Sequence, residues 1–311
     1  MTEPAQPHQR HRHLRHFTPL RYPGGKAKLA PFVKKLLQEN RLLDGEYVEP
    51  YAGGAAIALE LLFHEYVSRI HINDISKPLH AFWKSVLNDT EEFCRLIVKT
   101  PLTVAQWDKQ KRILEHVKEH DDVRVGFAFF FLNRTNRSGI LNGGIIGGRD
   151  QTGPWKIDAR YNPKELAHRV ESIARLKNRI SLTCMDALKF LSTGVGRWPQ
   201  QTFIYLDPPY YVKGRDLYFD YYEPSDHASV AEFMLGGVRG QRWIVSYDNV
   251  KPIRSLYRGA RYVIYDIGYS ARRASRGSEV MFFCDALRVP SLIGPVQVTA
   301  NHTRSPVRRI A

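Results

Sequence analysis

The pattern of apolar and polar positions divides the chain into short strands that alternate with amphipathic helices. Apolar residues recur at helical spacing between Leu29 and Leu37, and again between Leu166 and Leu176. Short runs rich in β-favouring residues predict strands at 47–49, 69–72, 180–185, 203–206, 243–247, 262–267 and 280–284. The last two runs predict a closing hairpin. Strands that alternate with helices in this way predict an α/β fold.

The alternation breaks between residue 77 and about residue 163. Helical patterns follow one another there without a strand, and they lead into the polar segment 133–139 and the Gly-rich segment 142–149. A loop-rich span of this length inside a compact α/β core is most simply an insertion. We therefore expect a discontinuous core domain at 19–78 and 164–288, an insertion at 79–163, a disordered basic tail at 1–18 and a mobile C-terminal tail at 289–311.

Composition limits the partners and the compartment. The 46 Lys and Arg residues exceed the 31 Asp and Glu residues, and the formal charge of +15 favours nucleic acid over an acidic small molecule. The cysteines are widely separated and lack CxxC spacing, so we expect neither a disulfide framework nor a metal site. No apolar run is long enough to cross a membrane and the N-terminus is polar, so we expect a cytoplasmic protein.

A glycine-rich turn after the strand at 47–49 predicts a nucleoside site. Gly53 and Gly54 would let the backbone pass beneath an adenosine-containing ligand. Asp74 ends the next strand about 20 residues later, where an acid reaches a ribose diol in such folds. The turn lacks the GxGxxG spacing of a dinucleotide site, which favours a nucleoside without phosphates. Asp74 is also placed to cap the helix that follows, and one side chain can serve both roles.

Two further strands end in a carboxylate, at Asp186 and Asp207. Pro208 and Pro209 follow and cannot donate ladder hydrogen bonds, so the strand stops and presents Asp207 at its carboxyl end. Ligands of open α/β sheets bind at that edge. Three strands that each end in an acid are hard to attribute to helix capping alone. Near the first helix, Lys26 could meet an anionic group.

Two polar segments are candidates for contacts with nucleic acid. Asn and Arg side chains pair with adenine and guanine edges, and the segment 133–139 contains several of them. The basic connection at 270–278 suits a phosphate backbone. A solvated loop is the alternative for both segments. The candidate contacts are Asn133, Arg134, Asn136, Arg137, Ser138, Arg272, Arg273 and Arg276.

Several short motifs stand at defined places relative to the predicted strands. They are Tyr22-Pro-Gly-Gly-Lys26, Glu49-Pro-Tyr-Ala-Gly-Gly54, Asn73-Asp74, the segment 133–139, Asp186, Asp207-Pro-Pro-Tyr210 and Ser278-Glu279-Val280. In this order they resemble the Dam-like class of S-adenosylmethionine-dependent DNA adenine-N6 methyltransferases. The resemblance covers residues 19 to about 285, and Asp-Pro-Pro-Tyr is its most specific part.

The resemblance implies an α/β fold with a Rossmann-like catalytic domain, which is a mixed sheet flanked by helices. It also implies an inserted, mainly helical target-recognition domain that reads double-stranded DNA. The implied cofactor is S-adenosylmethionine, with Asp74 on its ribose hydroxyls and Asp186 near its adenine. The residues that would surround it are Tyr22, Lys26, Glu49, Tyr51, Gly53, Asp74 and Asp186. Ala55 stands where many members have a third glycine, so its methyl group must fit beside the cofactor.

The Asp-Pro-Pro-Tyr motif suits the methylation of an adenine amino group. The base is inaccessible within a duplex and its amino lone pair is delocalised, so the base must be flipped out and the amino group oriented. Asp207 and the carbonyl of Pro208 can accept the two amino hydrogens, and Asp207 also stabilises the developing positive charge. Pro209 helps to lock the backbone, and Tyr210 offers a stacking face. No metal or covalent intermediate is required.

The residues leave two alternatives open. The motif chemistry needs only an exocyclic amine, so RNA adenine and cytosine N4 are rival substrates, although the motif order and the long insertion favour DNA adenine. A non-catalytic DNA-binding subunit could also retain the fold. The resemblance is compatible with a restriction-modification setting, but the sequence names no partner nuclease, defence-system subunit, recognition sequence or oligomeric state.

Overall fold

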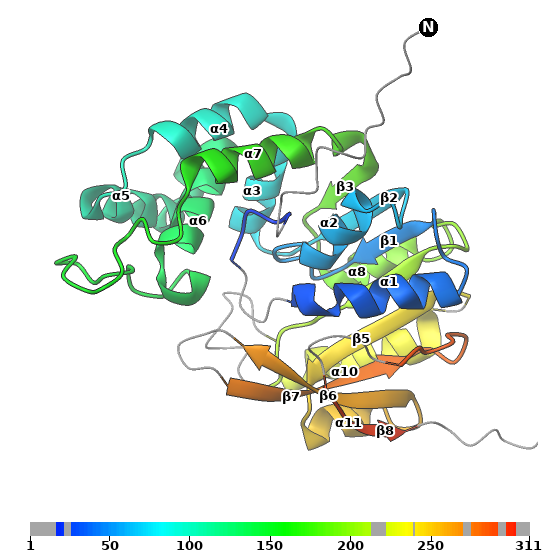
Figure 1. The fold of residues 1–311 in the computed structure, drawn as a ribbon. Coiled ribbons are helices and arrows are strands. Elements are labelled where there is room, and N and C mark those ends of the chain that lie inside the picture. The colour runs from blue at the N-terminus through cyan, green and yellow to red at the C-terminus, as the bar shows by residue number, and fades with distance from the viewer. Residues whose placement is uncertain are drawn as a thin grey trace, which may run out of the picture.

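One mixed sheet forms the centre of the protein. The computed structural model describes residues 17–21, 26–212, 222–238, 240–269, 275–291 and 297–302. Within this part of the chain, eight strands form one sheet in the order β3-β2-β1-β4-β5-β7-β6-β8 (Figure 1). In chain order they are β1 (Glu46–Glu49), β2 (Arg69–Asn73), β3 (Ile180–Thr183), β4 (Phe203–Leu206), β5 (Arg242–Asp248), β6 (Arg261–Tyr269), β7 (Ser275–Phe283) and β8 (Gln297–His302).

The strand directions confirm the expected Rossmann-like methyltransferase fold. β3, β2, β1, β4 and β5 run parallel, whereas β7, β6 and β8 are each antiparallel to the strand before them in the sheet. The chain builds one side of the sheet from β1 to β3 and then crosses to β4, which pairs directly with β1. The carboxyl ends of β1 and β4 therefore border the crevice in which open α/β sheets bind ligands.

Helices flank the sheet, and α1 shows why the sequence forms them. Its residues Phe32, Val33, Leu36 and Leu37 are fully buried at the helical spacing that the sequence predicted. Phe32 meets Phe283 of β7 edge to face, with ring centroids 6.4 Å apart. The flanking elements are η2 (Lys26–Leu29), α1 (Ala30–Glu39), α2 (Ala56–Phe63), α8 (Ala187–Gly194), α10 (Pro224–Glu232), η6 (Phe233–Gly237) and α11 (Lys251–Leu256).

A second group of helices lies in the chain between β2 and β3, and Figure 1 shows α4 to α7 grouped to one side of the sheet. The elements are α3 (Lys77–Asn88), α4 (Thr90–Lys99), α5 (Val104–Glu115), η3 (Val117–Glu119), α6 (Asp122–Thr135), η4 (Arg137–Gly139), α7 (Pro163–Ala174) and η5 (Lys177–Arg179). Most of α6 is buried, as its apolar run predicts for a central helix. Phe130 of α6 stacks on Phe82 of α3 at 6.0 Å and meets Phe93 of α4 edge to face at 5.7 Å.

The predicted terminal tails are partly wrong. Within the expected C-terminal tail, residues Gln297–His302 form β8 and pair with β6, for example His302 with Tyr262. An edge strand is held through backbone hydrogen bonds on one side and needs no apolar periodicity, so the sequence pattern did not reveal it. Within the expected N-terminal tail, Phe17 stacks on Phe63 of α2 at 4.3 Å. Residues 1–16 and 303–311 lie outside the described residues.

Membrane-spanning and metal-binding features were also sought in the described residues. None of their helices combines the length and the apolar character needed to cross a membrane. The same residues contain no group of three His, Cys, Asp or Glu side chains arranged to hold a metal ion. Cys94, Cys184 and Cys284 are not joined in disulfide bonds.

Candidate active site

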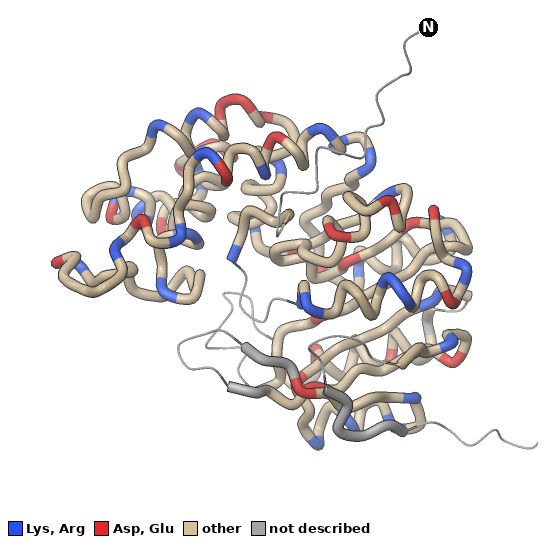
Figure 2. The backbone as a smooth tube through the Cα atoms, in the orientation of Figure 1, with Lys and Arg blue, Asp and Glu red and all other residues tan. Residues whose placement is uncertain are grey.

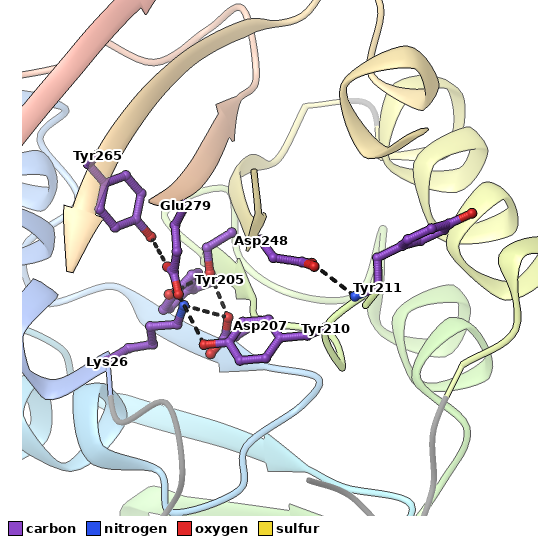
Figure 3. A network of polar contacts seen from close by, with 9 residues as sticks. Lys26, Tyr205, Asp207, Tyr210, Tyr211, Asp248, Tyr265 and Glu279 are labelled. Atoms are coloured by element: carbon purple, nitrogen blue, oxygen red, sulfur yellow. Dashed lines mark hydrogen bonds and ion pairs between the residues drawn. The ribbon is translucent and has the colours of Figure 1, made fainter. Parts of the chain in front are cut away.

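Asp207 stands at the carboxyl end of β4, which pairs with β1, at the edge where open α/β sheets bind ligands. All four residues of β4 are buried, and β4 pairs with β1 on one side and β5 on the other. Oδ1 of Asp207 accepts a hydrogen bond from Oγ of Ser246 on β5 at 2.7 Å, and the Ser246 hydroxyl also bonds to that of Tyr205 at 2.8 Å. The Asp207 side chain is 28% exposed, so it is held by the sheet yet open to a ligand (Figure 3).

Lys26 and Glu279 complete an ion cluster with Asp207 (Figure 3). Nζ of Lys26 lies 3.4 Å from Oδ1 of Asp207 and donates to Oε2 of Glu279 on β7. Glu279 also accepts hydrogen bonds from the hydroxyls of Tyr210, at 3.0 Å, and Tyr265, at 2.6 Å. Lys26 is 6% exposed and Glu279 is 1% exposed. One ammonium is therefore shared by two carboxylates away from bulk water.

The cluster shifts the pKa values of its members. Burial raises the pKa of Asp207 to about 6, because the Lys26 ammonium only partly offsets the lost hydration and the Glu279 carboxylate adds repulsion. Burial alone would lower the pKa of Lys26, but the carboxylates of Asp207 and Glu279 raise it above its ordinary value. At neutral pH, Asp207 is therefore ionised but close to its protonation step, while Lys26 stays charged.

Asp248 holds the backbone that follows the Asp-Pro-Pro-Tyr motif. Its carboxylate accepts hydrogen bonds from the backbone N–H groups of Tyr211, at 2.9 Å, and Val212, at 3.1 Å. The two prolines of the motif have no N–H group to donate, so these contacts fix the turn immediately after them. The sequence motifs gave no role to Asp248 or to Glu279, although Glu279 lies in the Ser278-Glu279-Val280 motif. The sequence signal for Asp248 was its place at the end of a predicted strand, and that for Glu279 was its place next to an apolar strand.

Three predicted cofactor residues lie where β1 and the turn after it meet the crevice. Glu49 is 6% exposed and accepts a hydrogen bond from the Tyr47 hydroxyl at 2.8 Å. Burial raises the pKa of Glu49 to about 8; the bond from Tyr47 lowers it, and the charge of Asp207 raises it further. The hydroxyl of Tyr51 bonds to that of Tyr222 at 2.9 Å. The third residue, Gly53, has φ +48, a left-handed conformation that glycine adopts without strain.

Asp74 and Asp186 hold turns at the ends of β2 and β3. Asp74 accepts hydrogen bonds from the backbone N–H groups of Gly53, at 3.0 Å, and Ser76, at 3.1 Å. Asp186 caps α8 by accepting from the N–H group of Lys189 at 3.0 Å. Two of the three strand-ending acids therefore hold turns or cap a helix, a role that the same side chain can combine with a ligand contact. The acid of the Asp-Pro-Pro-Tyr motif differs, because its partners are side chains.

Asn73 fastens the same strand ends together. Its Nδ2 donates to the carbonyls of Pro50 and Met185, both at 3.0 Å. Its Oδ1 accepts from the Thr183 hydroxyl at 2.8 Å and from the N–H group of Met185 at 3.1 Å. The ends of β1, β2 and β3 are thus joined through one buried amide.

Ala55 occupies a backbone conformation that favours glycine. Its φ of +46° and ψ of +35° are left-handed, and the residue is 1% exposed. A residue with a Cβ atom in this conformation costs roughly 1–2 kcal/mol. A preference for glycine at this position therefore follows from the backbone turn as well as from the space beside a cofactor.

Asn133 and Asn136 are buried, which corrects the prediction that they contact DNA bases. The Asn133 amide bonds to both the N–H and the carbonyl group of Arg21, each at 2.8 Å. Oδ1 of Asn136 accepts from Nε1 of Trp107 at 2.6 Å, and its Nδ2 donates to the carbonyl of Ile140 at 2.9 Å. Both side chains are 1% exposed or less. Their amides hold the chain together and do not face the surface.

The other candidate DNA contacts differ in exposure. Arg134 is half-buried and its Nη2 donates to the carbonyl of Arg160. Arg137 is exposed at the start of η4, and Ser138 turns the chain with φ +58°. Three predicted residues lie outside the described residues, namely Tyr22, Arg272 and Arg273, and the Arg276 side chain does too, although its backbone belongs to β7.

Comparison with known proteins agrees with this geometry. Residues 22–269 match the family model described as D12 class N6 adenine-specific DNA methyltransferase. The chain is also 25% identical over 263 residues to the type II methyltransferase M.MjaIII of Methanocaldococcus jannaschii, an alignment that covers 77% of this chain and 87% of that protein. The matched family span includes Lys26, Asp207 and Tyr210 and most of the chain. The protein therefore belongs to the D12 class N6 adenine-specific DNA methyltransferase family, and it is an enzyme that methylates DNA adenine.

Proposed function

We propose that this enzyme transfers the methyl group of S-adenosylmethionine directly to the amino nitrogen of an adenine flipped out of double-stranded DNA. The position of Asp207 carries the proposal. This carboxylate borders the crevice between β1 and β4, is held by Ser246 and Lys26, and remains 28% exposed. It can therefore accept a hydrogen bond from an incoming amino group without a change in the sheet.

Asp207 and the carbonyl oxygen of Pro208 would accept the two amino hydrogens of the adenine. This pairing favours a tetrahedral nitrogen whose lone pair points toward the methyl donor. The nitrogen gains positive charge as it is methylated, and the Asp207 carboxylate stabilises that charge. Pro208 and Pro209 keep the accepting carbonyl in place because their rings restrict the backbone.

Tyr210 would stack on the flipped adenine. Its hydroxyl is held by Glu279 at 3.0 Å, and Nζ of Lys26 lies 5.3 Å from its ring centroid. The ring is thus oriented before a base arrives. Stacking of a base on an aromatic ring contributes roughly 1–3 kcal/mol.

The ends of β1, β2 and β3 fit S-adenosylmethionine, which supplies an electrophilic methyl group on a positively charged sulfur. The proposed cofactor contacts are Glu49, Tyr51, Gly53, Asp74 and Asp186. Asp74 and Asp186 are carboxylates, which suits ribose hydroxyl and adenine amino groups, and the positive sulfur of the cofactor would favour the ionised form of Glu49. We keep Asp74 for the ribose and Asp186 for the cofactor adenine. Lys26 is assigned to the base side, because its ammonium is engaged by Asp207 and Glu279.

We assign the insertion expected at 79–163 to target recognition. Arg137 supports this role because it is exposed and makes no side-chain hydrogen bond or ion pair with a described residue. The buried amides of Asn133 and Asn136 would hold its segment in shape. M.MjaIII is named a type II methyltransferase, and we propose the same designation for this enzyme.

Radiolabelled S-adenosylmethionine, incubated with the protein and with DNA or RNA, tests the proposed reaction. Label should appear in DNA adenine. Asp207→Ala should abolish transfer but leave calorimetric binding of the cofactor largely intact, because the proposed cofactor contacts lie on other strands. Asp207→Asn, which keeps the shape of the side chain but not its charge, should also be strongly impaired. Label found only in RNA or in cytosine would overturn the proposal, and DNA binding without cofactor binding would indicate a non-catalytic subunit.

A further inference from the structure

Four arginines from separate segments meet where residues 17–21 run beside α6 and α7. The backbone of Arg21 is held on both sides by the Asn133 amide, and its Nη1 donates to the carbonyl of Asn136 at 3.2 Å. Arg134, next to Asn133 in α6, donates to the carbonyl of Arg160. We call Arg21, Arg134, Arg160 and Arg169 the arginine cluster.

Arg169 joins the cluster from α7 and ties it to the N-terminal segment. Its Nη1 donates to the carbonyl of Thr18 at 2.9 Å, and its Nη2 pairs with Glu165. The side chain is 11% exposed. Phe17 stacks on Phe63 of α2 at 4.3 Å. The segment that carries Arg21 is therefore fixed to both the sheet half and the helical half of the molecule.

Among the described residues, the arginine cluster forms one ion pair with a carboxylate, that of Arg169 with Glu165. The negative charge of Glu165 also raises the pKa of Arg134. Burial, together with the charges of Arg21 and Arg169, lowers the pKa of Arg134 to about 9. Burial and the charge of Arg160 lower the pKa of Arg21 in the same way. Like charges held together in this way repel one another and favour the binding of an anion.

Several donor groups of the cluster have no hydrogen-bond partner among the described residues. The Nε atoms of Arg134 and Arg169 are buried without a hydrogen bond. Arg160 is exposed, and its guanidinium bonds to no described residue. A guanidinium offers a planar set of donors that matches the oxygens of a phosphate. Carbonyl bonds hold part of the Arg21, Arg134 and Arg169 guanidinium groups in place, and the exposed guanidinium of Arg160 is available for such a group.

The position of the cluster relates it to the DNA substrate. Lys and Arg residues are spread over both halves of the molecule (Figure 2), so overall charge does not single out a contact site. Arg21, however, lies five residues before Lys26 in the chain, so their Cα atoms are at most ~18 Å apart. That distance corresponds to roughly five base-pair steps of a duplex. A duplex with its adenine at Asp207 can therefore reach the cluster with a nearby phosphate.

We propose that Arg21, Arg134 and Arg160 bind a backbone phosphate of the same DNA duplex whose adenine enters the active site, with Arg169 and Asn133 as positioning residues. The inference rests on the proposed function, since it requires duplex DNA as the substrate. We assign the cluster to the phosphate backbone, because converging positive charges recognise a phosphate but do not distinguish one base from another. The bound phosphate would relieve the repulsion among the arginines and set the position of the duplex.

The salt dependence of DNA binding tests this proposal. Arg160→Gln should reduce the slope of log binding constant against log salt concentration by roughly 0.9, the value expected for one lost phosphate contact. The loss of affinity should be equal for DNA with and without the methylation site. Arg134→Gln should reduce the slope in the same way. If the substitution at half-buried Arg134 impairs folding, the exposed Arg160→Gln variant still tests the site. Arg258→Gln is the matched control, because it removes one exposed positive charge just after α11, far from α4 to α7 in Figure 1.

Each outcome bears on one of the two proposals. An Arg160→Gln slope equal to that of the wild type, or a slope change no larger than that of Arg258→Gln, would overturn the phosphate site. A changed preference among DNA sequences would also overturn it, since it would mean that the arginine reads bases. Failure of the wild type to methylate adenine would instead sink the proposed function, and the slopes would still report whether the cluster binds phosphate.

Discussion

Nζ of Lys26 lies 3.4 Å from Oδ1 of Asp207 and at the same time donates to Glu279. Lys26 begins η2 just before α1, whereas Asp207 follows β4, so packing of the first helix on the sheet assembles the site. Burial raises the pKa of Asp207 to about 6, because the Lys26 ammonium, which Glu279 shares, offsets only part of the lost hydration. Two residues from distant parts of the chain therefore adjust a pKa that burial has raised.

Methyl transfer should decrease as the pH is lowered through about 6. Protonation of Asp207 removes the negative charge that stabilises the methylated nitrogen, and burial has moved this step upward from the ordinary aspartate range near 3.9. Values of kcat/KM, which report the pKa values of groups in the free enzyme, would show the acid limb when measured from about pH 4 to about pH 8. A limb that remains near the ordinary aspartate pKa would contradict the assignment.

Lys26→Met should move that acid limb to higher pH. The Lys26 charge lowers the pKa of Asp207, and an adjacent cation typically lowers a carboxyl pKa by about 1–3 units. Without it, most Asp207 would be protonated at neutral pH and the rate there would fall. Lys26→Arg keeps the charge and should leave the limb closer to its wild-type position. An unchanged limb in Lys26→Met would show that the ion pair does not control Asp207.

Tyr210 should matter for its ring more than for its hydroxyl. Tyr210→Ala removes the stacking face, and a loss of about 1–3 kcal/mol corresponds to a roughly 5- to 150-fold lower kcat/KM. Tyr210→Phe keeps the ring and loses only the hydrogen bond to Glu279, so its effect should be smaller. Tyr265→Phe removes a bond to the same carboxylate without touching the base. Tyr265→Phe should lower stability by about 0.5–1.5 kcal/mol and leave kcat/KM unchanged. If Tyr265→Phe lowered kcat/KM as much as Tyr210→Ala does, the stacking role of Tyr210 would be refuted.

Local patterns predicted the part of the site that local structure determines. Asp207 was found because an apolar run that ends in an acid and two prolines already specifies a strand and its end. The roles of Asp248 and Glu279 were not found, because they depend on the pairing of β5 with β7. That register places Asp248 directly opposite Glu279, and the separate sequence patterns of the two strands do not specify it.

The errors at Asn133 and Asn136 have the same origin. A polar residue in a polar segment resembles a surface residue, and only the tertiary structure shows that Trp107 of α5 and Arg21 supply its partners. The strand β8 was missed because an edge strand has little apolar pattern of its own. The fold class and the active-site motif were therefore accessible from sequence, whereas side-chain partners across elements were not.

Glu49→Gln should make the cofactor-free enzyme less sensitive to alkaline pH. Folded Glu49 keeps its proton up to about pH 8, whereas the unfolded chain releases it near the ordinary value of 4.5. The folded state therefore binds more protons over this range, and the free energy of unfolding contributed by Glu49 falls as the pH rises from about 4.5 to about 8. Thermal unfolding should show a larger gain in Tm for Glu49→Gln at about pH 8 than at about pH 5. Glu39→Gln, an exposed carboxylate on α1, should show no such difference; equal shifts at both pH values in Glu49→Gln would exclude the buried proton.

Substitution of Asn136 should lower stability, whereas substitution of the adjacent Arg137 should weaken DNA binding. Asn136→Ala leaves Nε1 of Trp107 and the carbonyl of Ile140 without their partner, so unfolding by urea should show a loss of about 1–3 kcal/mol. The methylated sequence should not change, because the amide does not reach the surface. Arg137→Ala removes an exposed side chain, so stability should stay within about 0.5 kcal/mol while DNA binding weakens. Sequencing of modified bases together with urea unfolding separates the two roles. An altered recognition sequence in a fully stable Asn136→Ala variant would show that Asn136 contacts DNA.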